Sequence, residues 1–318
     1  MTWPGCVSEL RVRTTGDGSF SLFSDRFGEG FHSAAGALSE ARNIFVGPAQ
    51  LERFAPGTTL VVLDVCVGTG SNTAALLEAC TDRGLMLLWR GLELEPPPLR
   101  LALSDPGFCT QWRPEILDPL RQVEARGCWT SPLGEGQLLW GDARGQLPSL
   151  IGELAGQVDL VLMDAFSPRR CPELWTLEFL GGLAALLKPS GRLLTYCCAA
   201  AVRAALRQLG LELAAICGCQ QRWSGGTVAS PGPLLAVDLG VDLSDPDALP
   251  AEVNNWLRPL SPMEREHLAT HAAVPYRDPT GQAPAALILD EREWRQRELQ
   301  LAGQLEPTSA WRRRWGLG

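Results

Sequence analysis

A carboxylate and an aromatic ring directly follow an apolar run at residues 158–163. Asp164 and Phe166 are succeeded there by Ser167 and Pro168. A carboxylate can bind an amine or an ammonium ion, and an aromatic ring can stack on a flat heterocycle. Because ligands of an open parallel sheet lie at the carboxyl ends of its strands, this pattern predicts a binding site for a substrate nitrogen. A simple strand-ending turn is the alternative, since Asp and Pro also end strands for backbone reasons.

A glycine loop lies upstream, between a strand predicted at residues 59–65 and a helix predicted at residues 73–80. Its glycines let the backbone approach a ligand, and the helix that follows offers free N–H groups to a negative charge. Thr73 stands where a dinucleotide-binding loop would have its third glycine, so the loop favours the methionine carboxylate of S-adenosylmethionine. The predicted cofactor-binding residues of this loop are Gly68, Thr69, Gly70 and Asn72.

Two more acidic residues end the next predicted strands. Glu93 closes a strand at residues 85–94, where a carboxylate can bind the ribose diol of the cofactor. Asp142 follows a strand at residues 137–140 and could accept a hydrogen bond from the adenine amino group. Each residue alone could be a polar strand terminus, but with Asp164 they form a series of acids at consecutive strand ends.

The elements that must position these residues alternate between strand and helix. Three later strands are predicted at residues 192–197, 211–217 and 233–239, which makes a seven-stranded, mostly parallel, doubly wound α/β sheet. Tyr196, in the fifth strand, is a further pocket candidate, although it could equally be a half-buried strand aromatic.

Three regions are predicted along the chain. An N-terminal hairpin and helix occupy residues 1–56, a core occupies residues 57–240, and a C-terminal helical extension occupies residues 241–318. The hairpin is predicted around residues 17–23, and one helix is predicted over residues 36–54, interrupted by Pro48.

Composition limits the classes of function. The 318 residues are 45% hydrophobic, with no apolar run near the roughly 20 residues of a membrane helix. We therefore expect a cytoplasmic protein that does not contact a membrane, and the scattered cysteines predict no metal site. The formal net charge of -8 means that RNA could bind only through a local patch, such as Arg169–Arg170 or the tail at residues 311–315.

Several segments together resemble one family, the bacterial tRNA 5-methylaminomethyl-2-thiouridine methyltransferases, or MnmC-type methyltransferase domain. The combination of Asp164-Ala165-Phe166-Ser167-Pro168 with Pro172-Glu173-Leu174-Trp175 is its most specific part. The family's glycine loop opens with Glu and a further Gly, whereas this chain has Asp64 and Cys66. The remaining matching segments are Asp17-Gly18-Ser19-Phe20, Phe31-His32-Ser33, Gly36-Ala37, Ser39-Glu40-Ala41-Arg42, residues 67–72, Gly91-Leu92-Glu93, Gly141-Asp142, residues 275–279 and residues 311–315.

The resemblance implies a Rossmann-like enzyme that uses S-adenosylmethionine to methylate the 5-aminomethyl group of the wobble (2-thio)uridine in tRNA. Separate enzymes would supply the aminomethyl intermediate. Asp164 would be the catalytic residue, and the substrate-binding residues would be Phe166, Pro168, Tyr196 and His32. A carboxylate with the ordinary pKa of about 3.9 is a weak proton acceptor, so we expect Asp164 mainly to orient the amine and stabilise its developing charge.

Two alternatives of other classes remain open. A small-molecule methyltransferase or a polyamine-synthase-like enzyme of the same fold would suit the acidic net charge. A nucleotide-binding module without catalysis would fit if Asp164 lay far from the cofactor loop.

Overall fold

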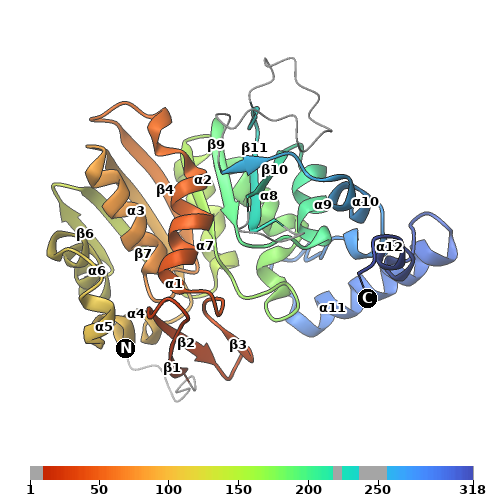
Figure 1. The fold of residues 1–318 in the computed structure, drawn as a ribbon, viewed down its shortest axis with the longest axis horizontal. Coiled ribbons are helices and arrows are strands. Elements are labelled where there is room, and N and C mark those ends of the chain that lie inside the picture. The colour runs from red at the N-terminus through yellow and green to blue at the C-terminus, as the bar shows by residue number, and fades with distance from the viewer. Residues whose placement is uncertain (1–9, 218–223, 236–255, 318) are drawn as a thin grey trace. The chain divides into compact units, whose positions relative to one another are not determined.

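The structure is a computed structural model that describes residues 10–217, 224–235 and 256–317 (Figure 1). Its contacts divide the chain into two compact units. The first unit comprises Met1–Gln146 and Leu162–Phe166, and the second comprises Leu147–Val161 and Ser167–Gly318. The domain boundaries predicted after residues 56 and 240 stay predictions, and the second of them lies outside the described residues.

The first unit begins with a small antiparallel sheet of β1 (Leu10–Thr14), β2 (Phe20–Ser24) and β3 (Glu29–Gly30). The Asp17 carboxylate accepts hydrogen bonds from the N–H groups of Ser19 (3.0 Å) and Ser39 (2.9 Å). The turn between β1 and β2 is thereby tied to the helical segment that follows. The predicted N-terminal hairpin is present, and it also uses residues before position 17.

The single helix predicted over residues 36–54 is broken into four short pieces. These are α1 (Ala37–Glu40), the π-helix η1 (Ala41–Val46), α2 (Gly47–Ala49) and the 3₁₀-helix η2 (Leu51–Arg53). Pro48 lies in the first turn of α2, where its missing N–H costs nothing. Gln50 ends α2 because it adopts a left-handed conformation with φ +53°.

The main strands of the first unit follow the order β8-β4-β5-β7-β6. Their bounds are Val158–Met163 for β8, Thr59–Val65 for β4, Met86–Glu93 for β5, Gly134–Trp140 for β7 and Cys128–Ser131 for β6. β4 and β5 are parallel, as are β5 and β7, whereas β6 and β7 are antiparallel. Val65 pairs with Leu92, and Glu93 pairs with Trp140, so these parallel strands end at one edge.

Helices of the first unit connect these strands. They are α3 (Ser71–Asp82), α4 (Pro97–Ser104), α5 (Pro106–Cys109) and α6 (Pro114–Arg126). Helix α3 contacts both η1 and α6, and α6 also contacts β6. Eight of the twelve α3 residues are buried, which agrees with a helix covered on several sides rather than a surface helix with one apolar stripe.

The second unit has the strand order β12-β10-β11-β9-β8, with β8 shared between the units. Its other strands are β9 (Leu187–Thr195), β10 (Glu212–Ile216), β11 (Gly226–Ser230) and β12 (Leu257–Arg258). Strand β11 pairs antiparallel with β9 and with β10, and β10 pairs antiparallel with β12. The helices are α7 (Ala143–Leu154, which begins in the first unit), η3 (Pro172–Trp175), α8 (Leu177–Leu186), α9 (Ala200–Gln208), α10 (Pro262–His267), η4 (His271–Ala273), α11 (Ala285–Leu301) and α12 (Thr308–Arg314).

The Rossmann-like alternation with a mostly parallel centre is confirmed, but the main sheet has nine strands among the described residues rather than seven. The short edge strands β6 and β12 were not predicted. The strand predicted at residues 233–239 is wrong over residues 233–235, and its remainder lies outside the described residues. The strand in this region is β11 (Gly226–Ser230), which lies before the predicted residues. It ends at Ser230 because Pro231 and Gly232 form a turn there.

A buried ion pair joins α9 to α10 in the second unit. Arg203 donates to Glu264 at 3.0 Å, and both side chains are almost wholly buried. Arg203 also donates to the Thr227 hydroxyl at 2.8 Å, and Arg258 donates to the other Glu264 oxygen at 2.7 Å. The partners satisfy the charge of Glu264, so this network attaches α10 to the sheet of its unit.

None of the described helices combines the length and the apolar character needed to cross a bilayer. Among the same residues, His, Cys, Asp and Glu form no group of three or more with a geometry suited to a metal ion.

Candidate functional site

The glycine loop connects β4 to α3 and contains several left-handed residues. Gly68 and Gly70 have φ angles of +57° and +83°, and Cys66 has a φ of +66°. Glycine adopts this region without strain, whereas a residue with a Cβ atom pays about 1 to 2 kcal/mol. A Cβ atom on Gly68 would lie 3.3 Å from the Phe31 ring. Cys66, which has a Cβ atom, therefore adopts this conformation at a cost in stability.

Glu93 is bound to this loop at the end of β5. One carboxylate oxygen accepts the Gly68 N–H at 2.7 Å, and the other accepts the Leu94 N–H at 2.7 Å. Burial raises the pKa of Glu93, against the lowering effect of these backbone donors. The oxygen bound by Leu94 also accepts the Glu95 N–H at 3.3 Å, whereas the oxygen bound by Gly68 has a second lone pair that can accept a hydrogen bond from a ligand diol.

The other predicted cofactor residues differ in their surroundings. The buried Thr69 hydroxyl contacts the Ser71 hydroxyl at 2.8 Å. Asp142 follows β7 at the same strand edge, where the Gly141 N–H donates to the Glu93 carbonyl at 2.9 Å. The Asp142 side chain is 52% exposed and forms an ion pair with Arg144 at 2.7 Å. Asp142 thus lies two residues after the end of β7, and its carboxylate is paired with Arg144.

Asp164 lies directly after β8 and is tied to the glycine-loop helix. Its Oδ2 accepts a hydrogen bond from Asn72 Nδ2 at 2.7 Å, and its N–H donates to the Val65 carbonyl at 3.2 Å. Burial raises the pKa of Asp164 well above its ordinary value, and the nearby Glu40 carboxylate raises it further, whereas the bond from Asn72 lowers it. The ordinary pKa assumed for Asp164 from the sequence therefore does not hold.

Two carboxylates that the sequence reasoning did not assign share this environment. Glu40, on α1, accepts the Ser33 N–H at 3.1 Å, and burial raises its pKa. Asp64, at the end of β4, is fully buried, and burial raises its pKa to about 7, against a hydrogen bond of 2.5 Å from the Thr73 hydroxyl. Glu40 was visible only as part of a family-like segment, because it lies far from the strand ends in sequence.

The Phe166 ring packs against two phenylalanines of the N-terminal sheet region. It stacks on Phe27 with ring centroids 4.5 Å apart and meets Phe31 edge-on at 5.1 Å. Neither partner was assigned a role from the sequence, although Phe31 belongs to a family-like segment. Because Phe27 covers part of Phe166, the three rings form an aromatic wall rather than one isolated ring.

His32 lies in the same N-terminal region as a half-buried, neutral residue. Its Nδ1 contacts the Ser21 hydroxyl at 2.9 Å. Burial lowers the pKa of His32 to about 4, against the opposing charge of Asp17. At pH 7 the ring therefore offers a neutral donor or acceptor rather than a cation.

Pro168 and Tyr196 belong to the second unit, so they are described by their own surroundings. Pro168 is buried in a turn in which the Ser167 carbonyl accepts the Arg170 N–H at 2.7 Å. Tyr196 follows β9, is half-buried, and meets the buried Trp175 ring edge-on at 6.3 Å. The remaining predicted residues, which the first unit contains, are Gly68, Thr69, Gly70, Asn72, Glu93, Asp142, Asp164, Phe166 and His32.

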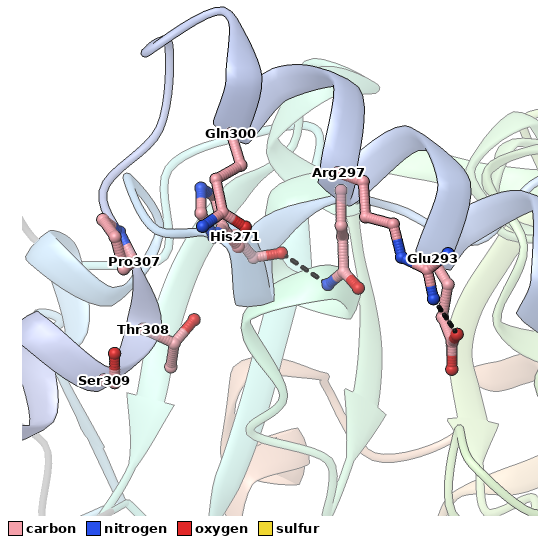
Figure 2. A pocket seen from close by; sticks show the side chains of 8 residues that line it. His271, Glu293, Arg297, Gln300, Pro307, Thr308 and Ser309 are labelled. Atoms are coloured by element: carbon pink, nitrogen blue, oxygen red, sulfur yellow. Dashed lines mark hydrogen bonds and ion pairs between the residues drawn. The ribbon is translucent and has the colours of Figure 1, made fainter.

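A polar cavity of about 440 Å³ lies in the second unit beside α11 and the start of α12 (Figure 2). It contains none of the predicted site residues, so it is separate from the arrangement around Asp164. Its lining residues are His271, Glu293, Gln296, Arg297, Gln300, Pro307, Thr308 and Ser309.

Comparisons with known proteins agree with the fold. The family described as S-adenosyl-L-methionine-dependent methyltransferase matches residues 130–230. The crystal structure of MNMC2 from Aquifex aeolicus superposes with a TM-score of 0.72 at 24% sequence identity, covering 92% of this chain and 86% of that one. This likeness shows the fold.

A curated relative adds sequence similarity. The tRNA 5-methylaminomethyl-2-thiouridine biosynthesis bifunctional protein MnmC of Cupriavidus necator is 29% identical over 232 residues, which is 66% of this chain. The match spans about a third of the length of that relative. In sequence, this chain is therefore similar to S-adenosyl-L-methionine-dependent methyltransferases and to part of an MnmC protein, and in fold it is similar to MNMC2.

Proposed function

We propose that the chain catalyses the S-adenosylmethionine-dependent N-methylation of the 5-aminomethyl group of (2-thio)uridine at the tRNA wobble position. The hydrogen bond of 2.7 Å between Asn72 and Asp164 carries this proposal. It links the helix after the glycine loop to the carboxylate after β8, so the proposed cofactor side and acceptor side meet in one compact unit. The named role of the curated relative in tRNA 5-methylaminomethyl-2-thiouridine biosynthesis supports tRNA as the acceptor.

The proposed cofactor residues fit S-adenosylmethionine chemically. The left-handed Gly68 and Gly70 open the loop backbone for a carboxylate, next to the N-terminus of the twelve-residue α3. The Glu93 carboxylate, fixed by the Gly68 N–H, suits a ribose diol, and Asp142 suits the adenine amino group. Thr69 and Asn72 complete the set. When bound, the cofactor supplies an electrophilic methyl group.

The acceptor amine must lose a proton before it can react. An alkyl amine with a reference pKa of about 10.4 costs about 4 to 5 kcal/mol to present in its neutral form at pH 7. The displacement also needs the nitrogen lone pair aimed at the methyl carbon. The site must therefore bind an ammonium ion, remove one proton and hold the resulting amine in place.

Asp164 and Glu40 are suited to this task as a pair. A buried carboxylate with a raised pKa is a better proton acceptor than an ordinary one, because its affinity for the proton is closer to that of the amine. We therefore assign Asp164 as the proton acceptor as well as the orienting group. When ionised, Glu40 places a negative charge near Asp164, which favours both ammonium binding and proton uptake. After transfer, the proton on Asp164 passes to water.

The remaining proposed substrate residues act on the base. The aromatic wall of Phe166, Phe27 and Phe31 borders the uracil, as rings often do for a base outside a helical stack. His32 offers a neutral hydrogen-bonding group. Pro168 and Tyr196 stay proposed substrate contacts of the second unit.

Two further points follow from the proposed chemistry. Methyl transfer consumes an existing amine and cannot create it, so separate enzymes supply the aminomethyl intermediate. An enzyme with this substrate acts in the cytoplasm, where tRNA is used in translation.

The test is a transfer assay with labelled S-adenosylmethionine. The protein should label tRNA that carries 5-aminomethyl-2-thiouridine and should not label the same tRNA without this modification. Asp164→Asn keeps an oxygen acceptor for Asn72 but removes the proton acceptor, so we expect transfer to fall by about 10² to 10⁴-fold while cofactor affinity, measured by calorimetry, stays near the wild-type value. The exposed Asp290→Asn on α11 is the matched control.

Equal labelling of both tRNAs, or of neither, would refute the proposal. Loss of cofactor binding in Asp164→Asn would reassign the residue to the cofactor side. Salt dependence separates the small-molecule alternative, because tRNA binding weakens steeply as salt rises whereas binding of a neutral metabolite barely changes.

A further inference from the structure

A tight turn three residues after Phe166 carries two exposed arginines. The Ser167 carbonyl accepts the N–H groups of Arg170 (2.7 Å) and Cys171 (2.9 Å). Pro168 and Cys171 are buried on either side of the turn, whereas Arg169 and Arg170 are exposed. The buried neighbours fix the backbone, so the two guanidinium groups start from a rigid base.

These two arginines have no ion-pair or side-chain hydrogen-bond partner among the described residues. Most of the other exposed arginines that the structure describes have an ion-pair or side-chain hydrogen-bond partner. Arg277, in the same unit, forms an ion pair with Glu178 at 2.6 Å, and Arg314 forms ion pairs with two glutamates. Positive charge on the turn is therefore available to an outside partner, even though the whole chain carries a net charge of -8.

Arg292, on α11, adds a third positive charge in the same unit. It donates to the carbonyls of Val274 (2.7 Å) and Ala272 (2.9 Å) and lies 4.5 Å over the Tyr276 ring. These partners are neutral and do not cancel its charge. Helix α11, which carries Arg292, contacts η3 directly after the turn. Burial is the main cause of the lowered pKa of Arg292; the charge of Arg169 lowers it further, and the charge of Glu293 raises it.

Arg169 and Arg170 follow the proposed acceptor carboxylate closely in the chain. Arg169 is five residues after Asp164, and five extended residues span at most about 18 Å. An RNA strand whose base reached Asp164 would bring its own backbone phosphates to this distance. Arginine suits such a ligand, since its planar fork matches phosphate oxygens in a bidentate manner.

We infer that Arg169, Arg170 and Arg292 form a phosphate-binding site for the RNA strand that carries the acceptor nucleotide. This arginine cluster rests on the proposed function and adds to it the contact that lets an acidic protein bind tRNA. Phosphate contacts supply much of the affinity for nucleic acid and fix its register, while the chemistry stays with the base.

The test compares two double variants of exposed arginines. Arg169→Gln/Arg170→Gln removes the charge of the turn, and Arg312→Gln/Arg313→Gln removes the same charge from the exposed face of α12. Affinity for tRNA is measured by fluorescence anisotropy between 50 and 200 mM salt, roughly the range over which phosphate contacts lose affinity. Each lost contact lowers the salt slope by about 0.7 to 0.9, so the turn variant should lose about 1.5 units of slope and about tenfold in affinity.

Four further measurements show whether the effect is confined to RNA binding. The turn variant should keep the wild-type kcat at saturating tRNA and the wild-type affinity for S-adenosylmethionine. Transfer to the free nucleoside 5-aminomethyluridine, which has no phosphate, should be unchanged. Because both substituted residues are exposed, thermal melting should match the wild type.

Wild-type affinity and slope in the turn variant would overturn the arginine cluster, as would an equal loss in the α12 variant. A loss of nucleoside methylation would overturn it too, since the turn would then act on the chemistry. Failure of the proposed function is read separately, from the absence of methyl transfer by the wild-type protein. If the wild-type protein binds tRNA without transferring methyl, the proposed function fails, but the tRNA affinities of the two double variants still test the arginine cluster.

Discussion

The buried Asp64 carboxyl should make the folded state less stable as pH rises. Its side chain is inaccessible to solvent at the end of β4, and burial raises its pKa from 3.8 to about 7, with a smaller contribution from the charge of Glu93 and an opposing hydrogen bond from Thr73. A carboxyl with a raised pKa in the folded state binds its proton more tightly there than in the unfolded state. This difference in proton affinity corresponds to about 4 kcal/mol.

The sign of the pH effect follows directly. The stabilisation is complete below about pH 4, where both states are protonated, and it is lost as pH rises through about 7. Asp64→Asn has a neutral side chain at every pH and keeps an acceptor for the Thr73 hydroxyl. The amide has its own cost at this position, but that cost does not change with pH. The difference in unfolding free energy between variant and wild type should therefore shift by about 4 kcal/mol in favour of the variant between pH 4 and pH 8.5.

Urea unfolding followed by tryptophan fluorescence at several pH values measures this difference. Asp290→Asn, on the exposed surface of α11, is the control and should follow the wild-type pH dependence. A variant-minus-wild-type difference that stays constant across the pH range would refute the reasoning, because Asp64 would then have the same pKa in both states.

Two further variants test the acid groups. Glu40→Gln removes a negative charge that raises the pKa of Asp164, so the acidic limb of the pH profile of kcat/KM should move to lower pH. The exposed Glu291→Gln is the control. An acidic limb that does not move in Glu40→Gln, or that moves equally in the control, would contradict the pairing of Glu40 with Asp164. Glu264→Ala leaves Arg203 buried without its carboxylate, so unfolding by urea at pH 7 should require about 3 to 5 kcal/mol less. Burial opposes ionisation of Glu264, but its arginine hydrogen bonds lower its pKa to about 2, so its contribution is present above pH 4.5 and lost as pH falls toward 2. An unfolding curve like that of the wild type would contradict this.

The strand ends were predictable because their signals are local. The β4 and β5 strands have apolar runs that stop at a glycine loop and at Glu93, and parallel pairing then brings such ends to one edge without further information. The place of Asp164 directly after β8 was predictable for the same reason. The raised pKa of Asp164 was not predictable, because it is caused first by burial and then by the charge of Glu40, which is remote in sequence.

Strand β11 and the breaks in the N-terminal helix were not predictable for a different reason. Strand β11 consists of small and polar residues such as Gly226 and Thr227, so its burial comes from antiparallel pairing on both sides and not from its own apolar pattern. The helical spacing over residues 36–54 was present, but Pro48 and the left-handed Gln50 divided that segment into short pieces.

The first unit contains four acids with raised pKa values: Glu40, Asp64, Glu93 and Asp164. Each loses its proton less readily because it is buried, so each makes the unliganded fold less stable at neutral pH. Both proposed ligands carry positive charge, on the sulfonium of the cofactor and on the ammonium of the acceptor. A cation in this environment favours the ionised carboxylates and removes part of the repulsion between them. Under the proposed function, the instability of the empty site and its affinity for two cations thus have one electrostatic origin.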